Sequence, residues 1–116
     1  TAARKGVYTL PDTIPAEWKR KYFTPNRDGT HTVAPAVRNN VDFRTFNLMS
    51  PIQFRRKFDM IFCRNVMIYF DQPTKDALVR RFYDATVPGG YFMISCSENL
   101  SAGMPYRRVA TAVFQK

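Results

Sequence analysis

FDMIFCRNVMIYFD, residues Phe58 to Asp71, is the stretch of this sequence that decides the fold. Its first half, Phe58 to Cys63, is a short apolar run with Asp59 as its one charged residue, which is typical of a strand buried on both faces of a parallel sheet. Arg64 and Asn65 follow where this strand would end. In an open α/β sheet, ligands bind at the carboxyl ends of the strands. We therefore expect a walled polar pocket for a small molecule at this tip.

The segments after this strand predict a strand–helix–strand unit. A helix is expected from about Pro73 to Thr86, capped by Asp71 or Gln72. Tyr91 to Cys96 then reads as the next buried strand, and the connection through a helix makes the two strands parallel. A last run, Val109 to Phe114, is expected to return to the sheet as an antiparallel strand.

The amino-terminal third predicts a short helix and a hairpin. Ile14, Trp18 and Tyr22 fall on one helical face, and we expect Trp18 to anchor a core. The turn signal Asn26-Arg27-Asp28-Gly29 separates two β-compatible runs, Tyr22 to Pro25 and Thr30 to Ala34. Thr1 to Thr13 is weakly patterned and is expected to be a loop or a frayed tail. Further on, Val41 to Asn47 alternates apolar and polar residues, which predicts a half-buried strand.

Composition limits the class of protein. The chain has 116 residues, 45% of them apolar, which is enough for one domain or part of one. No apolar run reaches the ~18 residues of a membrane span, and the amino terminus carries no signal peptide, so we expect a cytoplasmic protein. The sequence also lacks an initiator Met, which is expected of an internal fragment or a trimmed chain. Cys63 and Cys96 stand at the ends of predicted buried strands, and with the single His31 they give no metal-ligand spacing.

The net charge of +9 comes from 18 basic and 9 acidic residues. Much of it lies in the clusters Lys19-Arg20-Lys21, Arg55-Arg56-Lys57, Arg80-Arg81 and Arg107-Arg108. One interpretation is ordinary solvated surface, and another is attraction to an acidic protein helix. Nucleic acid ranks lower because no recognition motif accompanies the charge.

The stretch from Phe58 to Asp71 resembles the motif after the fourth strand of CheR-type chemotaxis receptor glutamate methyltransferases, which use S-adenosylmethionine. The resemblance extends to Val41 to Leu48 on the adenine side, to Pro88-Gly89-Gly90, and to Ser97-Glu98-Asn99-Leu100. Gly6-Val7-Tyr8 and Trp18 to Phe23 resemble the helical segment before the family's small β-subdomain. The resemblance implies an α/β fold: a class I, Rossmann-like, doubly wound methyltransferase sheet with an inserted antiparallel β-subdomain, here residues 22–40.

The resemblance also implies site residues. Asn47 and Leu48 match the adenosine-side positions, although Asn47 alone also reads as a plain turn residue. Arg64 and Asn65 match cofactor contacts, with pairing to a protein carboxylate as the alternative for Arg64. Tyr69 is the catalytic candidate, expected to position the target carboxylate, and a core tyrosine is the alternative.

Two positions in the loop after the next strand add to this picture. Glu98 is expected to orient loop backbone. Cys96 stands where many family members carry His, which argues against a catalytic imidazole there.

The implied reaction is methyl transfer to glutamates in the acidic cytoplasmic helices of chemotaxis receptors, leaving S-adenosylhomocysteine. A non-catalytic module that docks acidic proteins and a basic nucleic-acid-binding fragment are the alternatives. Strands 1 and 2 of the family fold, and the glycine-rich cofactor loop, have no counterpart in the chain. We therefore expect residues 1–116 to be the carboxyl-terminal portion of one methyltransferase domain, completed by a missing amino-terminal half or a second chain. The β-subdomain segment is short, which weakens the expectation of a bound receptor tail.

Overall fold

The computed structural model describes residues 2–116 and divides the chain into two compact units, Thr1–Thr45 and Phe46–Lys116. Each unit contains its own sheet, and helices accompany both sheets. The mixed parallel and antiparallel pairing in the second unit confirms the predicted α/β class.

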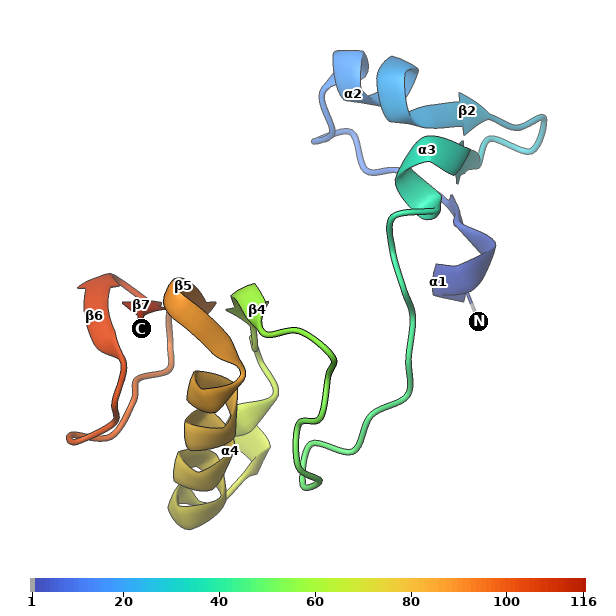
Figure 1. The fold of residues 1–116 in the computed structure, drawn as a ribbon. Helices are drawn as coiled ribbons and strands as arrows, with labels where there is room; N and C mark the ends of the chain where they lie inside the picture. The colour runs from blue at the N-terminus through green and yellow to red at the C-terminus, as the bar shows by residue number, and fades with distance from the viewer. Residues whose placement is uncertain (1) are drawn as a thin grey trace. The chain divides into compact units, whose positions relative to one another are not determined.

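The second unit is built on a four-stranded sheet in the order β4-β5-β7-β6. Its strands are β4 (Phe58–Phe62), β5 (Thr86–Met93), β6 (Arg107–Ala110) and β7 (Val113–Gln115). β4 and β5 run parallel, as predicted, and the other pairs are antiparallel. Figure 1 shows the labels β6, β7, β5 and β4 in this order, which leaves β4 at one edge of the sheet.

The helix α4 (Gln72–Asp84) covers this sheet and supplies one side of its core. Asp71 caps it by accepting a hydrogen bond from the Thr74 amide, which confirms the predicted cap. Leu78 and Phe82 are buried, and Phe82 packs against Phe92 with 5.4 Å between ring centroids. The apolar stripe of α4 therefore fixes the helix on the strand that follows it.

The core is closed by Tyr106, which precedes β6. Its ring stacks on Phe92 at a centroid distance of 5.0 Å, and its hydroxyl lies 2.7 Å from Thr86 Oγ1. Thr86 Oγ1 also donates to the Phe82 carbonyl at 2.6 Å. Burial raises the pKa of Tyr106 to about 12, so the phenol stays neutral inside the core.

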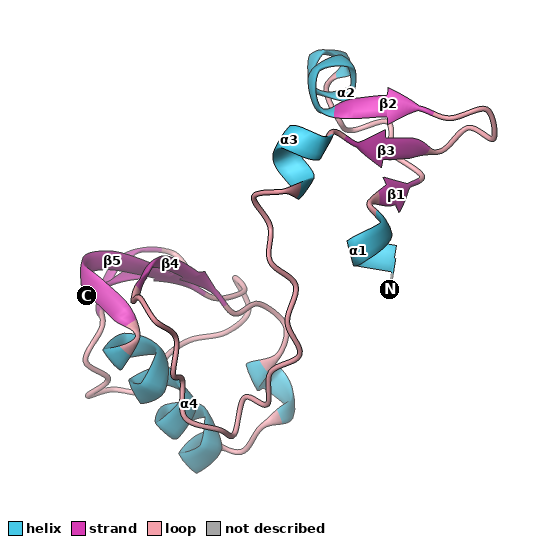
Figure 2. Ribbon diagram, turned by 45° about the vertical axis from the view of Figure 1, so that its right-hand side comes forward, coloured by secondary structure: helices cyan, strands magenta, loops and turns pink. Residues whose placement is uncertain are grey.

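The first unit carries a three-stranded antiparallel sheet in the order β1-β3-β2, formed by β1 (Val7–Tyr8), β2 (Phe23–Pro25) and β3 (His31–Val33). Figure 2 shows β3 between β2 and β1, with α2 (Ala16–Tyr22) next to β2. The predicted turn is present, since the Asn26 amide bonds Thr30 O at 2.8 Å and Gly29 has a φ of 87°. Two short helices, α1 (Ala2–Lys5) and α3 (Pro35–Arg38), complete the unit.

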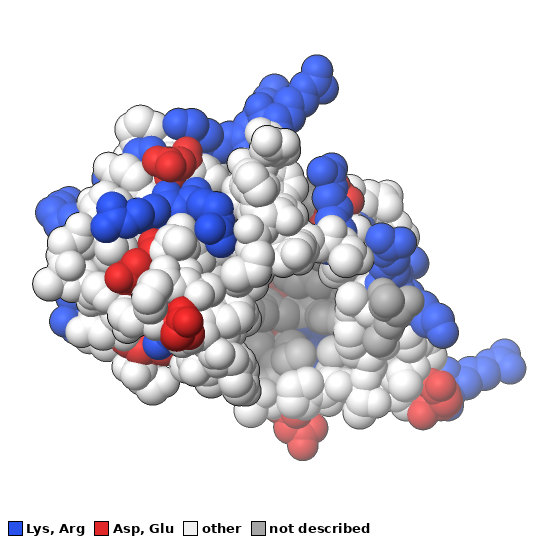
Figure 3. Space-filling view, turned by 90° about the horizontal axis from the view of Figure 1, so that it is seen from below, with Lys and Arg blue, Asp and Glu red and all other residues white. Residues whose placement is uncertain are grey.

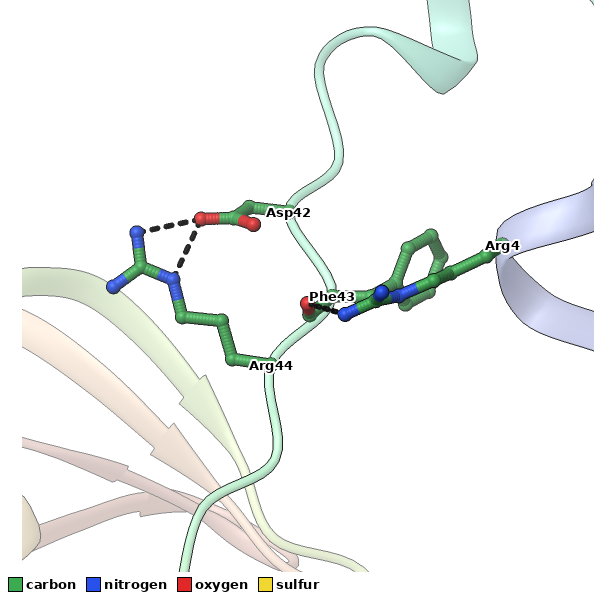
Figure 4. Close-up of polar contacts among 4 residues, drawn as sticks. All are labelled: Arg4, Asp42, Phe43 and Arg44. Carbon is green, nitrogen blue, oxygen red and sulfur yellow. Dashed lines mark hydrogen bonds and ion pairs between the residues drawn. The ribbon is translucent and has the colours of Figure 1, made fainter. Parts of the chain in front are cut away.

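The predicted strand over Val41 to Asn47 is wrong, since these residues form no strand. A strand needs a partner for its backbone groups, and within residues 2–116 none pairs with this segment. One backbone group is satisfied by a side chain instead, since Arg4 Nη2 donates to the Phe43 carbonyl at 2.9 Å. On either side of Phe43, the side chains of Arg44 and Asp42 form an ion pair at 2.7 Å (Figure 4).

Three other expectations in the first unit or at the second sheet are corrected. Trp18 is 57% exposed and does not anchor a core, because this small unit buries too little apolar surface to enclose it. Val7–Tyr8 is a strand where a loop, or part of a helical segment, was expected. The run from Val109 to Phe114 is not one strand but two, because Ala112 adopts a φ of 59° and the chain folds back there.

Candidate functional site

β4 ends in the polar tip that the sequence predicts. The amide of Cys63 continues the pairing by donating to the Met93 carbonyl at 2.9 Å, and Arg64 and Asn65 follow at once. Both are exposed, so the expectation of a walled pocket is wrong for this chain. β4 is also less buried than expected, with Met60 43% and Phe62 63% exposed. The reason is the same in both cases: β4 lies at the edge of the sheet, with β5 as its one neighbour in the described chain.

Asn65 turns the chain away from the strand. Its φ is 60°, in the left-handed region that asparagine enters more readily than most residues. The turn leads into the short 3-10 helix η1 (Met67–Tyr69), which is anchored by Met67 at 2% exposure. Asn65 is therefore placed by its backbone, and its side chain makes no hydrogen bond within residues 2–116.

Tyr69 projects from the end of η1. It is 81% exposed, so the core-tyrosine alternative does not hold in this structure. No side-chain hydrogen bond holds its hydroxyl within the described part of the chain. The phenol is thus available to a partner molecule, which is what a role in positioning an acceptor requires.

Asn47 and Leu48 lie in a loop of the same unit. Asn47 Oδ1 accepts from the Met49 amide at 3.0 Å, which is the turn arrangement, and among the described residues its Nδ2 has no hydrogen bond. Leu48 is half-buried and lines an apolar hollow of about 260 Å³ together with residues of β4, among them Ile61 and Phe62. The structure therefore brings Leu48 to β4, whereas no hydrogen bond in residues 2–116 joins the Asn47-Leu48 pair to Arg64 or Asn65.

The loop after β5 is held by Glu98, as the sequence predicts. Its Oε2 accepts from Ser95 Oγ at 2.6 Å and from the Ser95 amide at 3.3 Å, while its Oε1 is buried without a hydrogen-bond partner in the described chain. Burial, and then the charge of Glu98, raise the pKa of the Cys63 thiol to about 11. Cys63 is thus a protonated thiol at neutral pH and does not act as a nucleophile.

Sequence reasoning missed this proximity of Cys63 and Glu98, although one signal was present. Each follows one of two parallel strands, and the carboxyl ends of parallel strands meet at one edge of a sheet. It also missed a polar hollow of about 240 Å³ between η1, the start of α4 and the loop after β5. There Gln72 Nε2 donates to Ser101 Oγ at 2.6 Å and to Asp76 Oδ1 at 2.8 Å.

The other cysteine differs from its expectation. Cys96 is exposed, because β5 ends at Met93 and the chain has already left the sheet. Both cysteines are free. Within residues 2–116, no group of three or more His, Cys, Asp and Glu is arranged to hold a metal ion, and none of the helices is long and apolar enough to cross a membrane.

The strand tip carries groups that suit an amino-acid sulfonium cofactor. Asn65 offers an amide donor and a carbonyl acceptor, and Arg64 a guanidinium, with no competing ion pair or hydrogen bond in the described residues. These groups complement the carboxylate and amino groups of a methionine moiety. The alternative that Arg64 pairs with a protein carboxylate finds no partner in this part of the chain. The tip therefore fits one end of such a molecule.

Residues 1–113 match the family described as CheR methyltransferase, SAM binding domain. The chain is 42% identical to chemotaxis protein methyltransferase Cher2 of Pseudomonas putida over 74% of its own length and 31% of the relative. It is 38% identical to chemotaxis protein methyltransferase 1 of Pseudomonas aeruginosa, over 87% of this chain and 38% of that protein. It is 34% identical to the chemotaxis protein methyltransferase of Borreliella burgdorferi, over 98% of this chain and 41% of that protein. The chain thus spans about a third to two fifths of these relatives.

Proposed function

The chain belongs to the CheR methyltransferase family, and from that premise we propose that the protein containing it methylates glutamate side chains of chemotaxis receptors. The methyl donor is S-adenosylmethionine, and the products are a glutamate methyl ester and S-adenosylhomocysteine. The observation that carries the proposal is the match over residues 1–113, which includes the polar tip after β4 with its exposed Arg64 and Asn65. The reaction belongs in the cytoplasm, where the acidic receptor helices lie.

The reaction needs little acid–base catalysis from the side chains of the protein. S-adenosylmethionine, when bound, supplies a methyl group activated by the sulfonium centre. A glutamate carboxylate is already ionised at neutral pH, so no general base is required. The protein has to hold the carboxylate oxygen in line with the methyl group and to exclude water. The chain fits this requirement, since Cys63 at the end of β4 is a neutral thiol.

Residue roles follow from what each side chain offers. We assign Asn65 and Arg64 to the amino-acid end of the cofactor, because both are exposed at the strand tip and have no hydrogen-bond partner in residues 2–116. Asn47 and Leu48 are assigned to the adenosine end, Asn47 through its remaining Nδ2 donors and Leu48 through the apolar hollow beside β4. Tyr69 is assigned to the acceptor carboxylate, which its exposed hydroxyl can reach as a hydrogen-bond donor.

The remainder of the domain is also part of the proposal. β4 has a free edge in the described chain and apolar side chains exposed along it, and such an edge calls for a further strand. We assign residues 1–116 to the carboxyl-terminal portion of one methyltransferase domain, with 22–40 as an inserted β-subdomain whose sheet is completed by β1. The strand that pairs with β4 and the glycine-rich cofactor loop then come from the rest of the protein or from a second polypeptide.

Acidic receptor helices are the partner that the charge favours. Figure 3 shows Lys and Arg side chains projecting at several places on one face, with Asp and Glu among them. Arg20 and Lys21 on α2 have no ion pair in the described residues, so they are available to an acidic surface. A receptor tail at the three-stranded sheet is not part of the proposal, since its edge strands β1 and β2 have only two and three residues.

Mass spectrometry of a receptor fragment tests the proposed function. The intact protein is incubated with S-adenosylmethionine and the cytoplasmic fragment of a chemotaxis receptor, and the digested fragment is sequenced. We expect the mass of one methyl group on glutamate residues, and none on a fragment whose methylated glutamates are replaced by alanine. Methylation of another residue type, or of no residue, would overturn the assignment.

A further inference from the structure

A basic pocket lies at the opposite end of β4 from the polar tip. It has a volume of about 300 Å³ and is formed by the loop before β4 and by the last turn of α4. Its cationic lining is Arg56, Lys57 and Arg81, against one acidic residue, Asp84. Because strand β4 is five residues long, the pocket is separated from the tip by roughly 17 Å of extended chain. It is therefore distinct from the strand tip that is assigned to the amino-acid end of the cofactor and to methyl transfer.

Arg81 is the central group of this pocket. Its Nη2 donates to the Leu48 carbonyl at 2.6 Å, while its Nε is buried and has no hydrogen-bond partner in the described chain. Within residues 2–116, no carboxylate lies within ion-pair distance of this guanidinium. A partly buried arginine in a protein is usually paired with an anion. The pocket therefore holds an unpaired positive charge with two further cations, Arg56 and Lys57, exposed around it.

The walls of the pocket are held in place by the fold. The Phe58 amide donates to the Ala85 carbonyl at 2.7 Å, which ties the start of β4 to the end of α4. The bond from Arg81 to Leu48 fixes the loop on the other side. The remaining wall is apolar and consists of Pro51, Ile52 and Phe54. The fold thus holds both the cationic residues and the apolar residues of the pocket in place.

We propose that this pocket binds a small phosphate ester, with the phosphate on Arg56, Lys57 and Arg81 and the non-phosphate part against Pro51, Ile52 and Phe54. The net charge of the lining residues is positive by two, from three cations and one carboxylate, which complements the roughly two negative charges of a phosphate monoester. Arginine binds phosphate through two parallel hydrogen bonds. The volume lies at the lower end of small-molecule sites, about 300 to 1,000 Å³. The remoteness from Tyr69 makes the ligand an effector rather than a substrate.

Calorimetric titration of the intact protein with uridine 5′-diphosphate, inorganic pyrophosphate and uridine tests the proposal. Saturating S-adenosylhomocysteine is present throughout to keep nucleotides out of the cofactor site. We expect the diphosphate to bind and to bind more tightly than pyrophosphate, because of the apolar wall, and we expect no binding of uridine. Because the double variant removes charge-assisted hydrogen bonds to the phosphate, Arg56→Gln with Lys57→Gln is expected to weaken binding by about tenfold or more.

Arg55→Gln is the matched control, because Arg55 adjoins these residues in the sequence and does not line the pocket. It is expected to leave the affinity unchanged. Arg81→Lys, which keeps the charge and loses the planar fork, is expected to weaken binding of the diphosphate relative to this control. Circular dichroism melting of each variant confirms that it is folded.

Three outcomes would overturn the proposal. The first is the absence of binding heat with both phosphate compounds. The second is an equal loss of affinity in the Arg55→Gln control, which would indicate non-specific electrostatic attraction. The third is binding of a glutamate hexapeptide, but not of the diphosphate, with the same dependence on Arg56 and Lys57, which would make the pocket a protein-docking site. The affinity of the Arg56/Lys57 variant for S-adenosylhomocysteine is expected to equal that of the wild type, because neither residue is assigned to the cofactor, so the proposed function stands or fails separately.

Discussion

Asn65 has a backbone role in the structure and a proposed side-chain role in cofactor binding, and two substitutions separate the two. Glycine adopts the φ of 60° of this residue without strain, whereas alanine in this conformation lowers the stability of the fold by about 1–2 kcal/mol. If the amide contacts the cofactor, Asn65→Gly in the intact protein is expected to lose about 1–3 kcal/mol of S-adenosylhomocysteine affinity while keeping its stability. Asn65→Ala is expected to lose both. Calorimetry and thermal melting of the two variants give the answer, and unchanged affinity in the glycine variant would remove Asn65 from the cofactor site.

Tyr69 is predicted to act on the acceptor and not on the cofactor. Its side chain is exposed, so Tyr69→Phe removes no hydrogen bond within the described chain. We expect a lower kcat for receptor methylation with nearly unchanged affinity for S-adenosylhomocysteine, because the interaction matters mainly in the transition state. A variant that loses stability or cofactor affinity in the same proportion as kcat would show that Tyr69 is structural.

The two cysteines are predicted to differ in reactivity with a thiol reagent. Cys96 is exposed, whereas Cys63 is 6% exposed and its pKa is raised to about 11. At pH 8 we expect Cys96 to react first and Cys63 to react only after unfolding, so Cys96→Ser should abolish the fast phase. Because the folded pKa of Cys63 lies above the ordinary 9.0, its contribution to stability is present below pH 9.0 and is lost as the pH rises towards 11. Rapid labelling of Cys63 in the folded protein would contradict this placement.

At the scale of elements, Gly90 decides how closely β5 approaches β4. A Cβ at this position would lie 2.5 Å from Thr86 Cγ2 and 2.9 Å from the carbonyl oxygens of Asp59 and Val87. Two of these neighbours are backbone atoms of paired strands and cannot move without breaking the pairing. Gly90→Ala is therefore expected to destabilise the intact protein by about 1–3 kcal/mol in urea unfolding.

Gly89→Ala provides the control for that substitution. Gly89 has a φ of 81°, and no described atom lies within 4 Å of the place that a Cβ would take, so the change introduces backbone strain without a clash. We expect a smaller loss in the free energy of unfolding, of about 1 kcal/mol, and unchanged hydrogen-exchange rates of the β4 amides. Equal effects of the two substitutions would show that the clash at Gly90 is relieved by movement.

Elements with local signals could be predicted from the sequence, and elements that depend on a distant partner could not. The helix α4 carries its own cap, Asp71, and its own apolar stripe, and the hairpin in the first unit carries its own turn at Gly29. Val41 to Asn47 has the alternation of a strand, but a strand forms only beside another. The two-residue β1 has no pattern to read, because so short a run gives no periodicity.

The same distinction applies to the candidate site. The position of Arg64 and Asn65 at the end of a strand follows from an apolar run that stops, and it was predicted. Their exposure depends on what lies beside β4, which the run itself does not encode. The arrangement of Glu98 near Cys63 depends on which strands are neighbours, so it required the sheet order as well as the sequence.

At the scale of the whole molecule, the free edge of β4 is the feature that connects fold and function. In the described chain β4 pairs with β5 alone, and Met60 and Phe62 are exposed beside it. The chain spans 31% to 41% of three of its chemotaxis methyltransferase relatives. We infer that the cofactor site is complete only when a further strand lies against β4, since the tip residues by themselves fit one end of the cofactor.

Transfer of a labelled methyl group from S-adenosylmethionine to a receptor fragment tests this account most directly. The intact protein and the 116-residue chain are compared at equal concentration, and glutamate methyl ester is identified by release of the label as methanol in alkali. The account predicts alkali-labile label with the intact protein and none with the chain alone. Label transfer by the 116-residue chain at the rate of the intact protein, or alkali-stable label from the intact protein, would contradict it.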